Sequence, residues 1–393
     1  MRRVLVVAYY TPPLGMSGVM RVTKLCKFLP EFGWQPLVLT VKPVAYYHYD
    51  PALLGDLKRS KVYRTESIDP NRLFNLLRSK TRRFQPVLGT GLGAGARLLN
   101  YLLFPDSKVG WLPFGSVTGR HIIDAEKPAA IFASAPPFTS LLLGVRLKAH
   151  AHVPLVMDFR DPWPTGFAEP PRHQRASLRR FRRYLVEHAD ATLAVNEGTA
   201  RAVSLRAEVL DNGFDPSEFE VPAAQLDGTS IVHVGNLWQN HADVVAFVQA
   251  LRARPEARLY LAGRIDPATR QAFSHDPQVR LLGPVPHEQA CSLMKGATAL
   301  LYIGKPHQPV GLKLYEYFGA GRPIVVWGNG TDEAEKLVLQ AQAGAACRLD
   351  QARLLAALDE YTAGTGTPGQ VGRDRFNRRS QARWLADRLE SLI

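Results

Sequence analysis

The sequence predicts an α/β protein made of two Rossmann-like domains. Three observations support this fold class. The chain has 393 residues, which is long for a single hydrophobic core. Short apolar runs alternate with helical patterns, as expected for a parallel sheet covered by helices. The alternation then starts again in the second half, so each half is expected to form its own sheet.

Each half contributes a series of short, apolar strands. Strands of the first half are expected at residues 3–9, 36–41, 129–133, 155–158 and 191–195. Strands of the second half are expected at residues 230–235, 258–262, 279–282, 299–303 and 324–327. An Asn-Gly turn and a proline at residues 212–216 indicate the join, with the following polar stretch up to Gly228 as the alternative. We therefore expect domains at residues 1–215 and 216–368, followed by an amphipathic helix within residues 369–393.

Positive charge is concentrated in the first half. Residues 1–215 hold 30 basic and 17 acidic side chains, a net charge of +13. Residues 216–393 hold 19 basic and 18 acidic side chains, a net charge of +1. The two halves are therefore expected to face different partners, one polyanionic or membrane-bound and the other small. No stretch has the roughly 18–20 apolar residues that a membrane-spanning helix needs. Three cysteines without metal-ligand spacing favour a reducing cytoplasm.

A glycine-containing loop joins the first strand to the first helix. Gly15, Ser17 and Gly18 lie at this junction, where backbone N–H groups and the helix dipole favour an anion. The spacing is not G-x-G-x-x-G, so the dinucleotide fingerprint is absent. The alternative is an ordinary tight turn.

Residues 308–323 form the most specific stretch of the chain. Gly311 permits close backbone approach where a helix is expected to begin, and Lys313 adds a positive charge suited to a pyrophosphate. Glu316, one turn later, can accept hydrogen bonds from a sugar diol such as ribose. The alternative is that Lys313 and Glu316 form a solvated pair on the helix surface.

This stretch resembles the donor-site signature of the GT-B glycosyltransferases of family 4. The family pattern has two glutamates separated by seven residues, with an internal Gly-Leu pair; here Glu316 matches the second glutamate and Gly311-Leu312 the pair. The order of further landmarks is similar over the whole chain. These are the loop at residues 9–18, Asn212-Gly213, and a last helix that in the family crosses back to the first domain. Residues 134–137 and 158–163 resemble members that build bacterial surface polysaccharides.

The sequence departs from the family pattern at three donor-site positions. Gln308 replaces the first glutamate, Asn236 replaces the arginine after the first strand of the second domain, and His241 replaces a downstream lysine. The resemblance then implies that Arg264 and Lys313 carry the diphosphate of the donor. His241 can assist only when it is protonated.

The segment Asp158-Phe-Arg160-Asp161-Pro-Trp163 follows a predicted strand. It should therefore lie at the carboxyl edge of the sheet, where open α/β folds bind ligands. Arg160 and Trp163 are expected to bind the acceptor, and Asp161 to orient its hydroxyl. The alternative is an internal salt bridge between Arg160 and Asp161.

Two basic segments in the first half are amphipathic. Residues 72–84 and 172–188 combine Arg and Lys with Leu and Phe at helical spacing. Such segments suit an anionic membrane surface, and no nucleic-acid-binding fold is expected. The alternative is a solvated helix face packed on the sheet.

The resemblance implies a retaining, nucleotide-sugar-dependent glycosyltransferase. Two sheets would face each other across a cleft, with a lipid-linked or polysaccharide-precursor acceptor on the first domain. No cofactor and no obligatory metal are expected, since no Asp-x-Asp motif is present. The expected location is the cytoplasm, in peripheral contact with the inner face of the membrane. The alternatives are a 2-epimerase of the same fold and a non-catalytic homologue.

Overall fold

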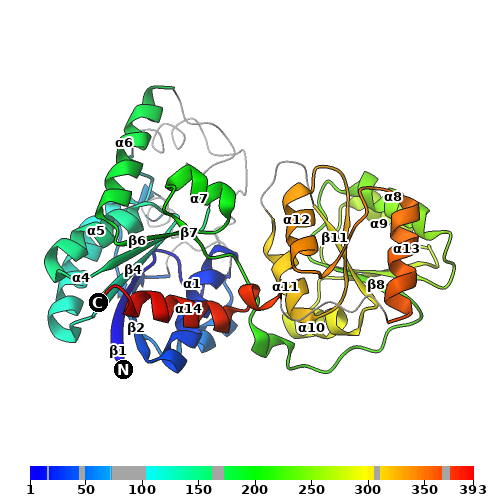
Figure 1. Ribbon diagram of the computed structural model, residues 1–393, viewed down its shortest axis with the longest axis horizontal. Helices are drawn as coiled ribbons and strands as arrows, with labels where there is room; N and C mark the ends of the chain where they lie inside the picture. Colours follow the sequence, from blue (N-terminus) through cyan, green and yellow to red (C-terminus); the bar gives the residue numbers. More distant parts are fainter. Residues whose placement is uncertain are drawn as a thin grey trace, which may run out of the picture. The chain divides into compact units, whose positions relative to one another are not determined.

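The computed structural model describes residues 1–15, 17–43, 49–70, 72, 103–161, 172–304, 310–364 and 372–393. The chain divides into two compact units (Figure 1). Unit 1 contains Met1–Asp211 and Gln381–Ile393, and unit 2 contains Asn212–Ser380. The division lies between Asp211 and Asn212, next to the Asn-Gly turn at which the sequence predicts the join. Unit 1 is thus discontinuous in sequence, whereas unit 2 is continuous.

The described part of unit 1 contains a seven-stranded parallel sheet with the order β3-β2-β1-β4-β5-β6-β7. Its strands are β1 (Arg2–Val7), β2 (Trp34–Val41), β3 (Lys61–Thr65), β4 (Ala130–Ala135), β5 (Leu155–Phe159), β6 (Ala191–Ala194) and β7 (Glu208–Val209). The central strands β4 and β5 are mostly apolar and are buried along their whole length, which is typical of a sheet covered on both sides. The direction of strand succession reverses between β1 and β4, which makes their carboxyl ends the switch point of the sheet.

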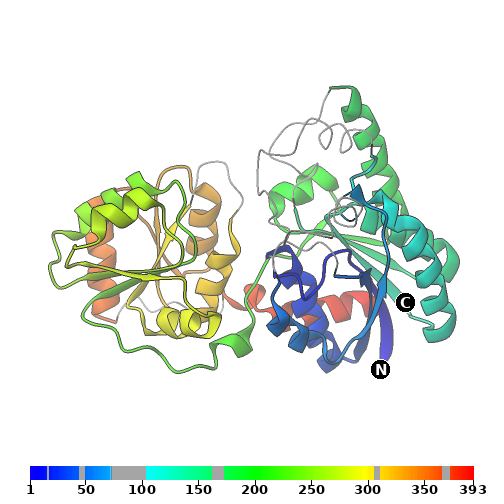
Figure 2. The same ribbon diagram turned by 180° about the vertical axis from the view of Figure 1, so that it is seen from behind.

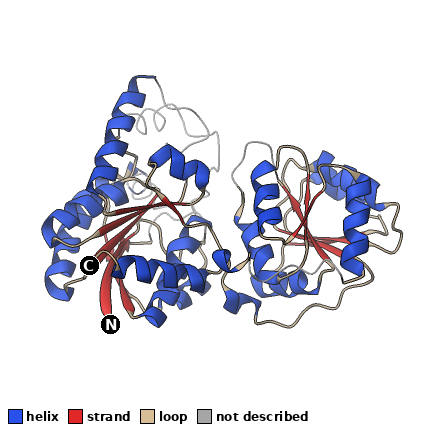
Figure 3. Cartoon of the chain, in the orientation of Figure 1, coloured by secondary structure: helices blue, strands red, loops and turns tan. Residues whose placement is uncertain are grey.

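Helices cover both faces of this sheet (Figure 3). The described helices on this sheet are α1 (Ser17–Phe28), α4 (Leu112–Glu126), α5 (Thr139–Ala151), α6 (Arg172–His188), α7 (Glu197–Val203) and α14 (Arg378–Glu390), with short 3-10 turns at Leu29–Phe32, Pro51–Leu57 and Val109–Trp111. One core lies under α4, α5 and α6. The other lies under α1 and α14, where Ala382, Leu385 and Leu389 are buried. The last helix therefore packs on the first unit, as the sequence predicts.

Unit 2 has, over its described residues, a six-stranded parallel sheet with the order β10-β9-β8-β11-β12-β13. Its strands are β8 (Ser230–Val234), β9 (Arg258–Ala262), β10 (Val279–Gly283), β11 (Ala299–Ile303), β12 (Ile324–Trp327) and β13 (Gly344–Ala346). The switch point of this sheet lies between β8 and β11. Two parallel-sheet α/β units are thus confirmed.

The helices of unit 2 also form two layers (Figure 2). They are α8 (His241–Leu251), α9 (Pro267–Phe273), α10 (His287–Gly296), α11 (Leu312–Ala320), α12 (Asp332–Gln340) and α13 (Gln351–Thr362), with 3-10 turns at Pro216–Phe219 and Asp374–Phe376. Helices α10, α11 and α12 share one core, and α8, α9 and α13 share the other. Helix α11 ends at Gly321, which has φ +69°, as the Gly-Arg-Pro sequence predicts.

The two segments that connect unit 2 to the rest of the chain are paired with each other. The N–H of Phe214 donates to the carbonyl of Phe376 at 2.8 Å, and the N–H of Arg378 donates to the carbonyl of Phe214 at 2.9 Å. The ring of Phe376 stacks on Phe318 of α11 with 4.4 Å between centroids. Both connections are therefore fixed to the core of unit 2.

Candidate functional site

The carboxyl edge of the unit 2 sheet is built for close approach of backbone segments. Gly235 follows β8 with φ +113°, and Gly263 follows β9 with φ +145°. A Cβ on Gly263 would lie 2.2 Å from the carbonyl oxygen of Gly235. Only glycine fits this conformation and this contact, so the two loops are held side by side at the switch point.

Lys313 lies over the loop after β8. It is the second residue of α11, and its Nζ is 3.4 Å from both the Nε2 atom of His233 and the carbonyl oxygen of Asn236. Its Cε lies 3.5 Å from the Cβ position of Gly235. The sequence places Lys313 at a helix N-terminus, and the structure adds that the ammonium group reaches the neighbouring switch-point loop.

The start of α11 has no side-chain cap. Gly311 is the N-cap residue, and its own N–H donates to the Tyr302 hydroxyl at 3.2 Å. A Cβ at Gly311 would meet no described atom within 4 Å. The first turn contains no acidic residue. Uncapped N–H groups, the helix dipole and Lys313 together favour an anion here.

Arg264 and Asn236 belong to the same edge. The side-chain oxygen of Asn236 accepts the N–H of Arg264 at 3.2 Å, which ties the loop after β8 to the loop after β9. The Arg264 side chain is exposed and forms no ion pair with any described residue. Asn236 thus stands where the family pattern has an arginine, and its side chain makes a loop-to-loop hydrogen bond.

His241 is the first residue of α8 and is oriented by two neighbours. Its Nδ1 lies 3.0 Å from the Thr269 hydroxyl oxygen, and this hydroxyl donates to Asp266 at 2.8 Å. Since the only proton of Thr269 goes to the carboxylate, Nδ1 of His241 must carry its own proton. No hydrogen bond of its Nε2 atom to a described residue is found.

The other donor-site predictions lie on or near α11. Leu312 is its first residue and Glu316 lies one turn after Lys313; both are half-buried. Gln308 lies outside the described residues. Sequence reasoning missed His233, whose signal is a histidine in the otherwise apolar strand β8.

Arg160 occupies the switch point of unit 1. It is 8% exposed, its N–H donates to the carbonyl of Ala135 at 3.0 Å, and its guanidinium donates to Pro136. A Cβ on Gly18, in the first turn of α1, would lie 3.1 Å from this guanidinium. The Nε atom is buried and has no hydrogen-bond partner among the described residues. Burial lowers the pKa of Arg160, although Asp161 and Asp158 act in the opposite direction.

The salt bridge of this region is not the one suggested by the sequence. Asp158 is fully buried and pairs with Arg21 of α1, whose Nη2 lies 2.7 Å from its Oδ1. Ser134 donates to the second carboxylate oxygen at 2.7 Å. Arg21 also donates to the carbonyl of Asp211 at 2.8 Å. The sequence analysis did not predict a role for Arg21. It could have been noticed as a charged residue within the apolar stripe of α1.

The remaining unit 1 predictions have different outcomes. Asp161 follows Arg160 and is exposed, while partial desolvation raises the pKa of its carboxyl group. Ser17 begins α1, and Gly15 lies in the loop before it. Trp163 lies outside the described residues. Of the predicted residues of unit 1, the structure thus shows a direct approach for Arg160 and Gly18.

The basic helix α6 turns its apolar side chains inward. Phe181 and Leu185 are buried in the core of unit 1, so they are not free to enter a bilayer. Arg179, Arg180 and Arg183 are exposed and form no ion pair with described residues. Of the segment 72–84, only Arg72 lies within the described residues. It is buried, with Nε 3.7 Å from Asp69.

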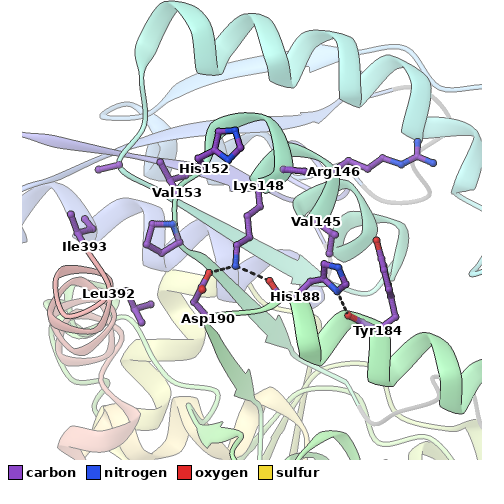
Figure 4. A pocket seen from close by; sticks show the side chains of 13 residues that line it. Val145, Arg146, Lys148, His152, Val153, Tyr184, His188, Asp190, Leu392 and Ile393 are labelled. Atoms are coloured by element: carbon purple, nitrogen blue, oxygen red, sulfur yellow. Dashed lines mark hydrogen bonds and ion pairs between the residues drawn. The ribbon is translucent and has the colours of Figure 1, made fainter.

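A cavity of about 900 Å³ lies at the opposite edge of the unit 1 sheet (Figure 4). It is lined by residues that precede β4, β5 and β6, by α5 and α6, and by Leu392 and Ile393. Lys148 spans it, donating to Asp190 at 2.6 Å and to the carbonyl of His188 at 3.0 Å. Since ligands of open α/β sheets bind at the carboxyl ends of strands, this cavity is on the wrong edge for the expected chemistry.

Two family models match adjacent parts of the chain. Residues 18–209 match a glycosyl transferase 4-like domain, and residues 228–361 match glycosyl transferases group 1. The chain belongs to the GT-B glycosyltransferases. The two matched regions of this glycosyltransferase correspond to units 1 and 2, and the Gly18 and Lys313 sites lie within them. A search among curated proteins finds no match to the sequence.

Solved structures agree on the fold of this glycosyltransferase. HepE of Anabaena, in complex with UDP and glucose, has a TM-score of 0.59 at 16% identity, with 100% of each chain covered. Sucrose-phosphate synthase from Thermosynechococcus elongatus has a TM-score of 0.63 at 15% sequence identity, and the match covers 100% of this chain and 99% of that chain. A putative UDP-N-acetylglucosamine 2-epimerase from Listeria monocytogenes has a TM-score of 0.58 at 11% sequence identity, and the match covers 99% of this chain and 96% of that chain.

The described residues contain no helix that is both long and apolar enough to cross a bilayer.

Proposed function

We propose that this glycosyltransferase moves a sugar from a nucleotide sugar to an acceptor hydroxyl with retention of configuration. The observation that carries the proposal is the anion site of unit 2. Lys313 and the N-terminus of α11 lie at the switch point of the sheet, and Arg264 belongs to the neighbouring loop, whose backbone N–H is bound by the Asn236 side chain. HepE, which has the same fold, is solved with UDP and with UDP-glucose. The donor of this chain is therefore proposed to be a UDP-sugar.

The chemistry of transfer follows from this arrangement. The bond between the anomeric carbon and the diphosphate oxygen breaks, and the developing negative charge falls on the diphosphate. Lys313, Arg264 and the N–H groups of α11 stabilise that charge, which lowers the barrier. The acceptor oxygen bonds to the same carbon on the same face, and the leaving diphosphate takes the acceptor proton. Asp161 orients the acceptor hydroxyl.

The acceptor is proposed to be anionic and lipid-linked. The Nε atom of Arg160 has no partner among the described residues, and the guanidinium lies against the first turn of α1, an arrangement suited to a phosphate group. The net charge of +13 on residues 1–215, obtained from 30 basic and 17 acidic residues, favours the same class of molecule. Such an acceptor places the enzyme at the inner face of the cytoplasmic membrane. No protein-bound metal is invoked, because the sequence has no Asp-x-Asp motif.

Nucleotide binding tests the donor site directly. A thermal-shift panel of UDP, GDP, dTDP, ADP and their sugars should show a rise in Tm with UDP and UDP-sugars for the wild type. At about 100 times its dissociation constant, the ligand adds roughly 2.7 kcal/mol to the free energy of unfolding. Glu316→Ala should abolish the shift, since Glu316 is proposed to hold the ribose diol.

Exposed Glu360, in α13 of the same unit, provides the matched control. Glu360→Ala should keep the full shift. Absence of a shift with every nucleotide would favour the non-catalytic homologue. Interconversion of a UDP-sugar and its C2 epimer without acceptor would favour the epimerase.

Membrane binding is expected to depend on charge alone, because the apolar face of α6 is buried. Wild-type protein should sediment with phosphatidylserine-containing vesicles in a salt-sensitive manner. Reversing Arg179, Arg180 and Arg183 to Glu should weaken binding by roughly a hundredfold or more, at about 1 kcal/mol per lost cation. The matched control reverses three exposed arginines of unit 2, namely Arg270, Arg280 and Arg353. Equal loss in both variants would contradict a specific role for α6.

A further inference from the structure

His233 is buried directly beneath the proposed diphosphate site. It is the fourth residue of β8, is fully shielded from solvent, and is used by none of the steps above. A polar ring in the middle of a parallel sheet is costly unless its nitrogens have partners. Both nitrogens have partners among the described residues, and the backbone of Gly235 is a further hydrogen-bond partner of the ring. Nδ1 lies 2.9 Å from the carbonyl oxygen of Leu301, and Nε2 lies 3.4 Å from Nζ of Lys313.

The first contact fixes the proton on the ring. A carbonyl oxygen can only accept, so Nδ1 of His233 must be the donor to Leu301. Burial and the nearby charge of Lys313 lower the pKa of His233 well below its usual range. The ring is therefore neutral with its proton on Nδ1, and Nε2, which can then accept a hydrogen bond, lies 3.4 Å from the Lys313 ammonium.

The second contact restricts the position of the Lys313 ammonium. A lysine side chain has several rotatable bonds and gains little from a single long contact. Here the printed contacts of Nζ include two acceptors among the described residues, Nε2 of His233 and the carbonyl oxygen of Asn236, each at 3.4 Å, and the side-chain stem lies on Gly235. The ammonium is held at the switch point rather than spread through solvent.

We propose that His233 is a positioning residue that fixes the Lys313 ammonium for the donor diphosphate by accepting its hydrogen bond through Nε2. This inference rests on the proposed function of Lys313. It also explains how one lysine serves a site in which the family arginine and second lysine are replaced by Asn236 and His241. A preorganised cation stabilises a leaving group better than a mobile one.

A double-mutant cycle on UDP affinity tests the proposal. His233→Phe keeps the ring volume and removes the acceptor, and should raise the Kd for UDP by roughly tenfold, the loss of one hydrogen bond to a charged group. In a Lys313→Ala background, the same substitution should leave the Kd unchanged. His233→Gln restores an acceptor and should recover most of the affinity. Equal weakening in both backgrounds would overturn the proposal, as would no weakening in either.

A purely structural effect has its own control. Val232→Ala removes a fully buried side chain from the same strand without touching Lys313. It should lower the Tm but leave the Kd for UDP at the wild-type value. If Val232→Ala weakens UDP binding as much as His233→Phe does, the effect of His233 is one of stability and the proposal is wrong.

A ligand-free measurement separates this inference from the function on which it rests. Acetylation of Lys313 by acetic anhydride, followed by peptide mass spectrometry, should be faster in His233→Phe, because the ammonium has lost an acceptor. Unchanged labelling would overturn the contact. Failure of wild-type protein to bind UDP would instead overturn the donor assignment, and the labelling result would still decide whether His233 holds Lys313.

Discussion

Lys313→Ala is expected to lower kcat for sugar transfer by roughly 10²–10³, equivalent to about 3–4 kcal/mol of barrier. The ammonium of Lys313 lies at the start of α11, next to Gly235 and within 3.4 Å of the Asn236 carbonyl oxygen. It is the cation best placed to meet charge that develops on the diphosphate. Because this charge is larger in the transition state than in the bound donor, the loss should appear mainly in kcat. Steady-state transfer with a saturating UDP-sugar measures it.

Two control variants make the Lys313 result specific. Lys336→Ala removes an exposed lysine from α12 of the same unit and should leave kcat unchanged. Lys313→Arg keeps the charge but not the ammonium geometry, and should retain only part of the activity. A wild-type rate in Lys313→Ala would show that the diphosphate is stabilised elsewhere.

Arg21→Met is expected to destabilise unit 1 by about 3–5 kcal/mol, the cost of leaving one member of a buried ion pair without its partner. Arg21 and Asp158 are each at most 1% exposed. The substitution leaves the Asp158 carboxylate in the sheet with only the hydroxyl of Ser134 as a hydrogen-bond donor among its described contacts. It also removes the donor to the Asp211 carbonyl.

Hydrogen exchange followed by mass spectrometry measures this loss unit by unit. Peptides of β1, β4 and β5 should exchange at least roughly a hundredfold faster in Arg21→Met, since 1.4 kcal/mol corresponds to a factor of about ten. Peptides of unit 2 provide the internal reference and should not change. Arg21→Met combined with Asp158→Asn should recover part of the stability, because no buried charge remains unpaired. Equal loss in the single and double variants would exclude an electrostatic cause.

The sequence predicts the central strands better than the edge strands. Residues 258–262, 299–303 and 324–327 are confirmed as β9, β11 and β12 without any shift. Their apolar runs are continuous because both faces of a central parallel strand are buried. Three edge strands, β3, β7 and β13, were missed. The sequence Gly-Ala-Ala of β13 carries no strand signal of its own, and its pairing with β12 defines it.

Only some residues of the candidate site could be predicted from the sequence. Lys313 and Gly311 could be found from their place at a helix start, because that signal is local. The partners of Lys313 could not, since His233 and Lys313 are 80 residues apart and meet only through the sheet topology. The same holds for Arg21 and Asp158, which are separated by 137 residues. Contacts between distant strands and helices are set by tertiary packing, which no local pattern encodes.

The discontinuity of unit 1 has a consequence for the order in which the protein can be made. On the ribosome, Asn212–Ser380 emerges as an uninterrupted stretch and contains every strand of its own sheet. Met1–Asp211 emerges earlier but lacks Ala382, Leu385 and Leu389, which fill the core beside α1. Until these residues are synthesised, that apolar surface is exposed, and the nascent unit 1 is expected to need a chaperone. Unit 1 therefore begins to be translated before unit 2, but it can complete its fold only after unit 2 has been synthesised.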